Sequence, residues 1–216
     1  MSMIRHVTAP LIDRNPVTLQ ILGICSALAV TTSLTTALTM SVALTVVLCA
    51  SAAIISAVRR HIPSSIRLII QITIIASLVI VIDEFLQAYA FQISQRLSIF
   101  VGLIVTNCVV LGRAESFAMR NPVWPSVLDG LGNGLGYSLI LMIVGGVREF
   151  FGAGTLFGQA VVTTQADGGW FQPLGLMSLA PSAFFILGLL IWAIRSLRRD
   201  QIEEPEYRLV TKEAEQ

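Results

Sequence analysis

The sequence predicts an all-α integral membrane protein with six transmembrane segments, and two observations carry this prediction. Only 12% of its 216 residues are charged, against about a quarter in ordinary globular domains, and 55% are hydrophobic. The charged residues are also absent from three long apolar runs, at 36–58, 68–82 and 168–194. With their flanking residues, such runs approach or exceed the roughly 18 to 20 residues that cross a bilayer as a helix.

The first half of the chain contains one short and two long apolar segments. Residues 1–16 are interrupted by charges and prolines, so we expect a non-spanning N-terminal segment there. A short apolar segment follows at about 17–32. The next, at about 35–58, is rich in threonine, serine and alanine, which is typical of membrane helices that pack closely. The third, at about 66–90, follows a basic turn and carries two acidic residues toward its far end.

The second half repeats this order of short, long and long. Its apolar segments lie at about 97–112, 126–150 and 176–197, and a polar tail covers 199–216. The short segments of both halves have about 16 residues and rise only about 24 Å as helices, less than a hydrocarbon core of about 30 Å. We therefore expect half-helices or re-entrant segments at these two places.

This order predicts an inverted-topology repeat inside one membrane domain. The domain covers 17–198, and the two repeats cover about 17–92 and 97–198. Three crossings in each half would give the halves opposite orientations, with a site near the middle of the membrane.

The basic residues support an even number of crossings. If every segment crosses, twelve of the fourteen basic residues lie on one side, and only Arg96 and Arg148 lie on the other. The positive-inside rule then places both termini in the cytoplasm. A cleavable signal peptide is the competing interpretation, because residues 27–29 resemble a small-residue cleavage site, but the charge division argues against it. The twelve are Arg5, Arg14, Arg59, Arg60, Arg67, Arg113, Arg120, Arg195, Arg198, Arg199, Arg208 and Lys212.

All three cysteines lie in apolar segments, so a disulfide framework is not expected. Cys25 and Cys108 hold equivalent places in the two short segments, and the repeat would bring their thiols together at the membrane centre. Packing as small hydrophobes and binding of a metal or cluster both stay open for this pair. Because iron–sulfur clusters and structural zinc usually take four protein ligands, binding would need a second chain. Cys49 has no counterpart, and we expect it to pack.

Several polar and glycine-rich stretches are also candidates. The stretch DGLGNGLGY at 129–137 spaces its glycines for close helix packing, although Asp129 and Asn133 could instead face a polar cavity. We expect Arg113 and Glu115, at a cytoplasmic boundary, to orient the chain or contact another subunit. Residues 148–149, Arg-Glu, are interpreted as an interfacial pair at the end of the fifth segment.

Catalysis by this chain alone is not expected. The sequence contains no histidine cluster, nucleophile–base arrangement or paired catalytic carboxylates, and His6 and His61 lie outside the spanning segments. It also lacks the basic patches and aromatic platforms of nucleic-acid-binding proteins.

Six stretches of the chain together resemble a known family. They are LGICSALAVTT, IASLVIVID, IVTNCVVLGRAESFAM, DGLGNGLGY, GGWFQPLGLM and LAPSAFF. The family comprises membrane subunits of bacterial Na⁺-translocating NADH:quinone oxidoreductases and of the related Rnf ferredoxin:NAD oxidoreductases, and the resemblance covers about residues 10–198. Ser26 stands where the Rnf subunits typically have proline, and they lack the GGWFQP-like stretch. Both features favour the D-type branch of the Na⁺-translocating enzymes.

The resemblance implies a six-helix protein of the bacterial cell inner membrane that pairs with a homologous E-type subunit in opposite orientation. The two chains would bind one intramembrane 2Fe–2S cluster with two cysteines from each, here Cys25 and Cys108. Electrons would pass from NADH through flavin to this cluster, and on to flavins and quinone, coupled to Na⁺ export. NAD, FAD, FMN, riboflavin and quinone would bind other members of a six-subunit complex. Candidate hydrogen-bond donors to the cluster sulfurs are Ser26, Thr106, Asn107 and backbone N–H groups freed at the helix breaks.

Three alternatives stay open at the level of the sequence. The chain could be the equivalent subunit of an Rnf-type complex. It could be a secondary transporter or channel, which inverted repeats with broken helices also suggest, although no acidic residue falls at mid-membrane. It could also be a structural scaffold whose cysteines are inert.

Overall fold

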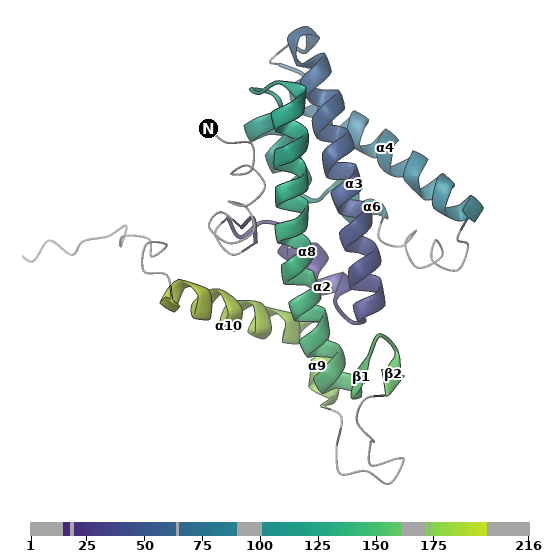
Figure 1. The fold of residues 1–216 in the computed structure, drawn as a ribbon, viewed down its shortest axis with the longest axis vertical. Coiled ribbons are helices and arrows are strands. Elements are labelled where there is room, and N and C mark those ends of the chain that lie inside the picture. The colour runs from purple at the N-terminus through teal and green to yellow at the C-terminus, as the bar shows by residue number, and fades with distance from the viewer. Residues whose placement is uncertain are drawn as a thin grey trace, which may run out of the picture.

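A computed structural model of the chain describes residues 15–17, 20–63, 65–89, 101–160, 172 and 174–197. Three long helices dominate it: α3 (Leu34–Val58), α4 (Arg67–Tyr89) and α8 (Val123–Ala153) (Figure 1). Their apolar stretches are long enough to cross a membrane, which confirms the second, third and fifth predicted segments as apolar helices. The shorter elements are α2 (Ile24–Val30), η1 (Arg59–His61), α6 (Val101–Val105), α7 (Cys108–Arg113), η2 (Ala114–Ala118), β1 (Thr155–Leu156), β2 (Gln159–Ala160), α9 (Gly175–Ser178) and α10 (Pro181–Leu197).

Helices α3 and α8 run antiparallel and pack along most of their length (Figure 1). Two glycines of α8 permit this close approach. A Cβ at Gly130 would lie 3.2 Å from the Leu48 carbonyl oxygen, and one at Gly134 would lie 2.8 Å from the Thr45 side chain. The prediction that the glycine stretch serves helix packing is therefore confirmed for this pair of residues.

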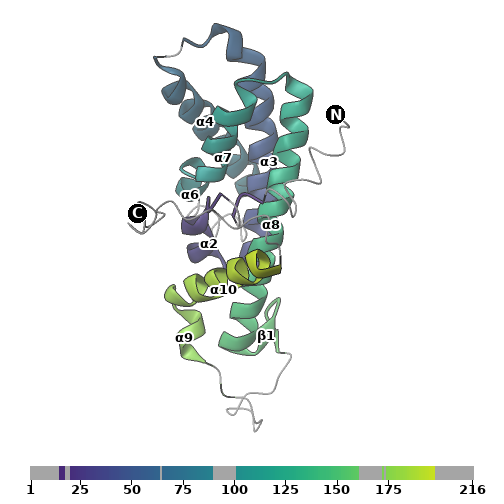
Figure 2. The ribbon, with the colours of Figure 1, turned by 90° about the vertical axis from the view of Figure 1, so that its left-hand side faces the viewer.

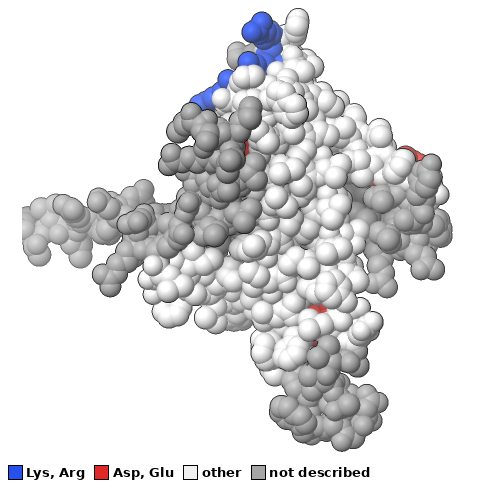
Figure 3. All heavy atoms as spheres, in the orientation of Figure 1, with Lys and Arg blue, Asp and Glu red and all other residues white. Residues whose placement is uncertain are grey.

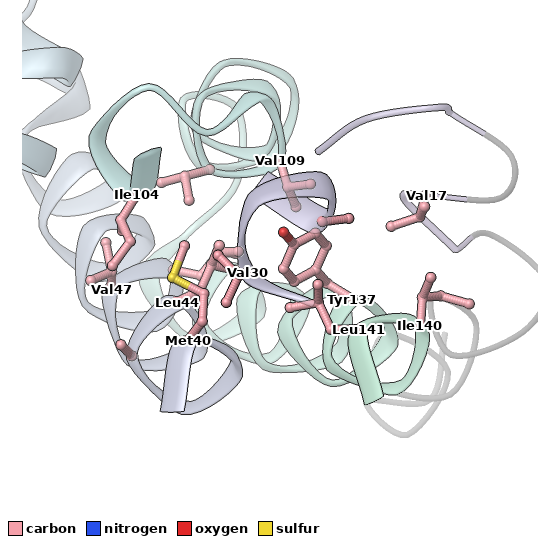
Figure 4. Packing of buried hydrophobic residues seen from close by; sticks show 14 of the residues in the cluster. Val17, Val30, Met40, Leu44, Val47, Ile104, Val109, Tyr137, Ile140 and Leu141 are labelled. Atoms are coloured by element: carbon pink, nitrogen blue, oxygen red, sulfur yellow. The ribbon is translucent and has the colours of Figure 1, made fainter. Parts of the chain in front are cut away.

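The hydrophobic core lies where the short helices α2 and α7 pack against the α3–α8 pair. Figure 4 shows Val30 of α2 and Val109 of α7 close to Tyr137 and Leu141 of α8. All four side chains are fully buried. The core therefore surrounds the two short segments that carry Cys25 and Cys108.

Within the described residues, the helices of both predicted short segments are too short to cross a bilayer. The helical part of the first is only seven residues, about 10 Å long. The fourth is broken at Thr106 and Asn107 into α6 and α7, of five and six residues. In Figure 2, α2, α6 and α7 gather beside the middle of α3.

The sixth predicted segment is broken as well. Helix α9 ends at Ser178, Leu179 has an extended backbone, and α10 begins at Pro181. In Figures 1 and 2, α10 lies across α8 rather than along it. Within the described residues, three helices have the length and composition of a span, so six crossings and the inverted repeat stay predictions.

Charge and hydrophobicity are distributed over the surface as in a membrane protein. Arginines gather at the end where α3 leads into α4, and most of the remaining described surface in this view is uncharged (Figure 3). Large hydrophobic side chains are exposed along α4 and α10, where lipid or other subunits would cover them. They include Leu68, Ile69, Ile80, Val81 and Phe85 of α4, and Phe184, Phe185, Leu189, Trp192 and Leu197 of α10.

Candidate cofactor site at two paired half-helices

Each of the two paired cysteines lies in the first turn of a short helix. Cys25 is the second residue of α2, which follows Gly23 in the left-handed region at φ 78°. Cys108 is the first residue of α7, and the preceding Asn107 is its N-cap. The Asn107 side-chain oxygen accepts a hydrogen bond from the Val109 N–H at 2.9 Å. This N–H is one of those in the first turn that have no acceptor within the helix.

A buried hydrogen-bond network joins the two helix starts. The Asn107 amide donates to the Ser26 hydroxyl at 3.0 Å, and the Ser26 and Tyr137 hydroxyls lie 2.5 Å apart. These three residues are at most 3% exposed. The structure therefore brings the Cys25 and Cys108 motifs together in space.

Gly23 permits the close approach of α2 to this network. A Cβ at this position would lie 2.8 Å from Cε2 of Tyr137 and 3.0 Å from Cγ2 of Val109. Its positive φ also disfavours any other residue. The glycine before the first cysteine is thus required both by backbone conformation and by space.

The Cys25 and Cys108 thiols are exposed in the single chain, although their neighbours Ser26 and Asn107 are buried. Among the described residues, no group of three or more His, Cys, Asp or Glu side chains could hold a metal ion. Two thiols on adjacent helix starts fit half of a four-thiolate set whose other half comes from outside the chain. Cys49 differs, because it is half-buried and its Sγ lies 3.9 Å from the Val127 carbonyl oxygen of α8.

The three side chains expected to donate to cluster sulfurs have other partners. The Ser26 hydroxyl also contacts the Gly23 carbonyl at 2.9 Å, besides Tyr137 and Asn107. Thr106 Oγ1 donates to the Gly102 carbonyl at 2.9 Å. Ser26 and Asn107 therefore join the helix starts in the single chain, and hydrogen bonds from Ser26, Thr106 or Asn107 to cluster sulfurs stay predictions.

The interpretation of Arg148 and Glu149 as an interfacial pair is wrong, because the two side chains are buried and bond to different partners. Arg148 is 2% exposed and reaches the last carbonyls of α2 and α9. Glu149 points elsewhere and accepts a hydrogen bond from the Leu34 N–H, the first of α3, at 2.6 Å. Its other oxygen accepts from Gly158 N–H at 2.9 Å. The positive Arg148 lies at the C-terminal ends of α2 and α9, and the negative Glu149 lies at the N-terminal end of α3. Both charges are therefore opposite in sign to the helix dipole beside them, which is stabilising.

The charged residues near α7 bond within the chain. Arg113 forms a two-contact ion pair with Asp129 of α8, with its Nε 2.8 Å from the carboxylate. Asp129 therefore does not line a polar cavity as the sequence had allowed. Glu115 pairs with Arg67 at 2.6 Å. These bonds hold α7 and the π-helical turn η2 to α8 and α4, and a contact of Arg113 or Glu115 with another subunit stays a prediction.

Sequence reasoning missed Tyr137 and the partners of Arg148. Tyr137 closes the glycine stretch DGLGNGLGY, and a hydroxyl in a predicted span needs a buried partner. That requirement was the available signal, but the partner lies 111 positions away.

These observations define a class: a helical membrane protein that presents two thiols from neighbouring half-helices. Residues 3–191 match the family described as "Rnf-Nqr subunit, membrane protein". The chain belongs to this Rnf-Nqr family of membrane subunits.

Several bacterial membrane-enzyme subunits are similar to nearly the whole chain. It is 60% identical over 200 residues to the D-type subunit of the Na⁺-translocating NADH-quinone reductase of Serratia proteamaculans, covering 93% of this chain and 96% of that one. The D-type subunit of the same enzyme from Pseudomonas paraeruginosa is 60% identical, with 93% and 90% covered. That of Shewanella oneidensis is 59% identical over 197 residues, with 91% and 94% covered.

Proposed function

We propose that this chain is the D-type subunit of a Na⁺-translocating NADH:quinone oxidoreductase, and that Cys25 and Cys108 supply two of the four ligands of an intramembrane 2Fe–2S cluster. The names of relatives at 59–60% identity support the first part and favour this complex over an Rnf-type one. One observation carries the second part. Two exposed thiols stand on helix starts that the Ser26–Asn107 hydrogen bond holds together.

The donor set is suited to this cluster. Thiolates are the usual ligands of 2Fe–2S clusters, and four of them are needed. This chain offers two, so a homologous E-type subunit in opposite orientation would supply the other two across the exposed face. When bound, the cluster would carry single electrons between the NADH-oxidising side of the complex and its flavins and quinone.

The chain's own residues would prepare the site. The first turns of α2 and α7 direct the positive ends of their helix dipoles toward the cysteines, which favours negative charge there. Tyr137 and Val109 are fully buried next to Gly23, where the chain enters the helix that carries Cys25. Asn107 and Ser26 fix the separation of the two helix starts through their hydrogen bond.

The surrounding architecture follows from the same proposal. The chain would cross the bacterial inner membrane six times, as two inverted repeats, with both termini in the cytoplasm. The basic residues of η1 and Arg67 then lie on the cytoplasmic side, as the positive-inside rule requires. Other subunits would bind NAD, FAD, FMN, riboflavin and quinone, and the complex would couple electron transfer to Na⁺ export.

Purified complexes with single cysteine substitutions test this function. Cys25→Ala and Cys108→Ala should each abolish the electron paramagnetic resonance signal of the intramembrane 2Fe–2S cluster and stop quinone reduction. Cys49→Ala is the matched control, because Cys49 packs against α8 and should leave both unchanged. A full cluster signal and iron content in the assembled Cys25→Ala complex would rule the proposal out.

A further inference from the structure

Arg148 is a buried cation at the junction of two short helices. Its guanidinium donates to the Leu28 carbonyl and the Thr31 hydroxyl at the end of α2, at 3.2 and 2.7 Å. It also donates to the carbonyls of Met177, Ser178 and Leu179, at 3.2, 3.4 and 3.1 Å, where α9 ends. One side chain thus ties α8 to both helix ends.

All these acceptors are neutral. Glu149, the adjacent acid, uses its carboxylate at the start of α3 and at Gly158. The contacts of Arg148 within the described residues go to carbonyl and hydroxyl oxygens, so its charge faces dipoles rather than a carboxylate. The last carbonyls of a helix carry partial negative charge, which compensates a cation only in part.

Helix α2 is held at both ends by the same long helix. Tyr137 contacts Ser26 at its start, and Arg148 contacts Leu28 and Thr31 at its end. Along α8, Tyr137 and Arg148 are separated by a rise of about 16 Å, so the two contacts hold α2 at separate points of the long helix. The position of Cys25 therefore depends on both contacts.

We propose that Arg148 is a positioning residue for the half-helix that carries Cys25, and that its charge raises the reduction potential of the site at Cys25 and Cys108. This inference rests on the function proposed above. A cluster held there would gain one negative charge on taking an electron from the flavin or iron–sulfur donor of the complex. A cation one short helix away, in surroundings of low dielectric constant, stabilises that added charge.

Potentiometric titration of the cluster signal in the purified complex tests the charge. Arg148→Gln removes the cation and should shift the reduction potential to a more negative value. Arg148→Lys keeps the positive charge but loses the planar guanidinium and several of its hydrogen bonds, so the reduction potential should stay close to that of the unchanged complex. Arg67→Gln is the control, because that arginine is half-exposed and paired with Glu115, and its loss should leave the potential unchanged.

A second pair of variants keeps Arg148 in place. Thr31 is fully buried and lies 2.7 Å from the guanidinium, so Thr31→Asp would set a carboxylate beside it. This substitution should lower the potential as Arg148→Gln does, whereas Thr31→Asn, of the same shape without charge, should not. The pair measures, in a chain that keeps Arg148, whether a change of charge at this end of α2 reaches the site at Cys25 and Cys108.

The outcomes separate the two proposals. An unchanged potential in Arg148→Gln, or equal potentials in Thr31→Asp and Thr31→Asn, overturns the role of Arg148 and leaves the cysteine ligands standing. A cluster signal that survives loss of Cys25 overturns the proposed function itself. A more negative potential in the Gln and Asp variants alone supports the inference.

Discussion

The Asn107 amide donates a 3.0 Å hydrogen bond to the Ser26 hydroxyl, across 81 positions of sequence. Asn107 immediately precedes Cys108, and Ser26 immediately follows Cys25. Because both residues are buried, water cannot readily replace the bond if it is lost. This single contact therefore fixes the two cysteine-bearing helix starts to each other.

A double-mutant cycle on Ser26 and Asn107 should reveal this coupling. Each change to alanine should lower the stability of the purified complex, with Asn107→Ala costing about 1 kcal/mol more because it also removes the α7 cap. The double mutant should be less destabilised than the sum of the singles, by about 0.5 to 1.5 kcal/mol. Thermal unfolding of the purified complex in detergent measures the stability of the three variants.

The control for this cycle pairs Ser26→Ala with Ser126→Ala. Ser126 bonds the Pro122 carbonyl at the far end of α8, so the two effects should add. Additivity in the Ser26–Asn107 pair as well would mean that their hydrogen bond contributes nothing to holding the helix starts together.

Gly23→Ala should destabilise the site strongly. The substitution places an L-residue at φ 78° and sets a Cβ 2.8 Å from Tyr137, so strain and overpacking together should cost roughly 2 to 4 kcal/mol. Gly188→Ala in α10 is the control, because nothing lies within 4 Å of its Cβ position and alanine favours a helix. Comparable thermal stability of the two variants would contradict this account of Gly23.

The long segments were predictable because their signal is local. The predicted ranges 35–58 and 66–90 begin within one residue of α3 and α4, since the charge-free apolar runs at 36–58 and 68–82 mark both helices. The break in the sixth segment also had a local signal, because Pro181 suits the first residue of a helix and resists any later position. That signal was outweighed by the length of the apolar run.

The side-chain partners were not predictable, because they depend on which helix face each residue occupies. Arg148 and Glu149 are adjacent in sequence, which suggested a pair. Consecutive residues of a helix point about 100° apart, so the two side chains reach different neighbours. The pairing of Ser26 with Asn107 likewise needs the packing of two broken helices, although the equivalent places of their cysteines had indicated that the segments meet.

Breaking the Arg113–Asp129 pair from one side should be costly. Their side chains are only 17% and 7% exposed, so either Asp129→Asn or Arg113→Gln leaves a poorly solvated charge, at a cost of about 3 to 5 kcal/mol. Replacing both with leucine should cost less than either single change. Arg67→Gln, which breaks the more exposed pair with Glu115, should cost about 1 kcal/mol or less in the same unfolding assay. Equal losses for the two pairs would show that burial does not decide their contribution.

Thiol labelling should separate the three cysteines by environment. Cys25 and Cys108 are exposed in the single chain, so only a partner and a bound cluster can protect them. In the intact complex, a maleimide reagent should leave both unlabelled, and chemical removal of the cluster should make both reactive. Cys49, half-buried against α8, should label to the same low extent before and after, which provides an internal control. Mass spectrometry of the labelled peptides measures all three at once. Full labelling of Cys25 and Cys108 in a complex that retains its iron would mean that the two thiols are not ligands.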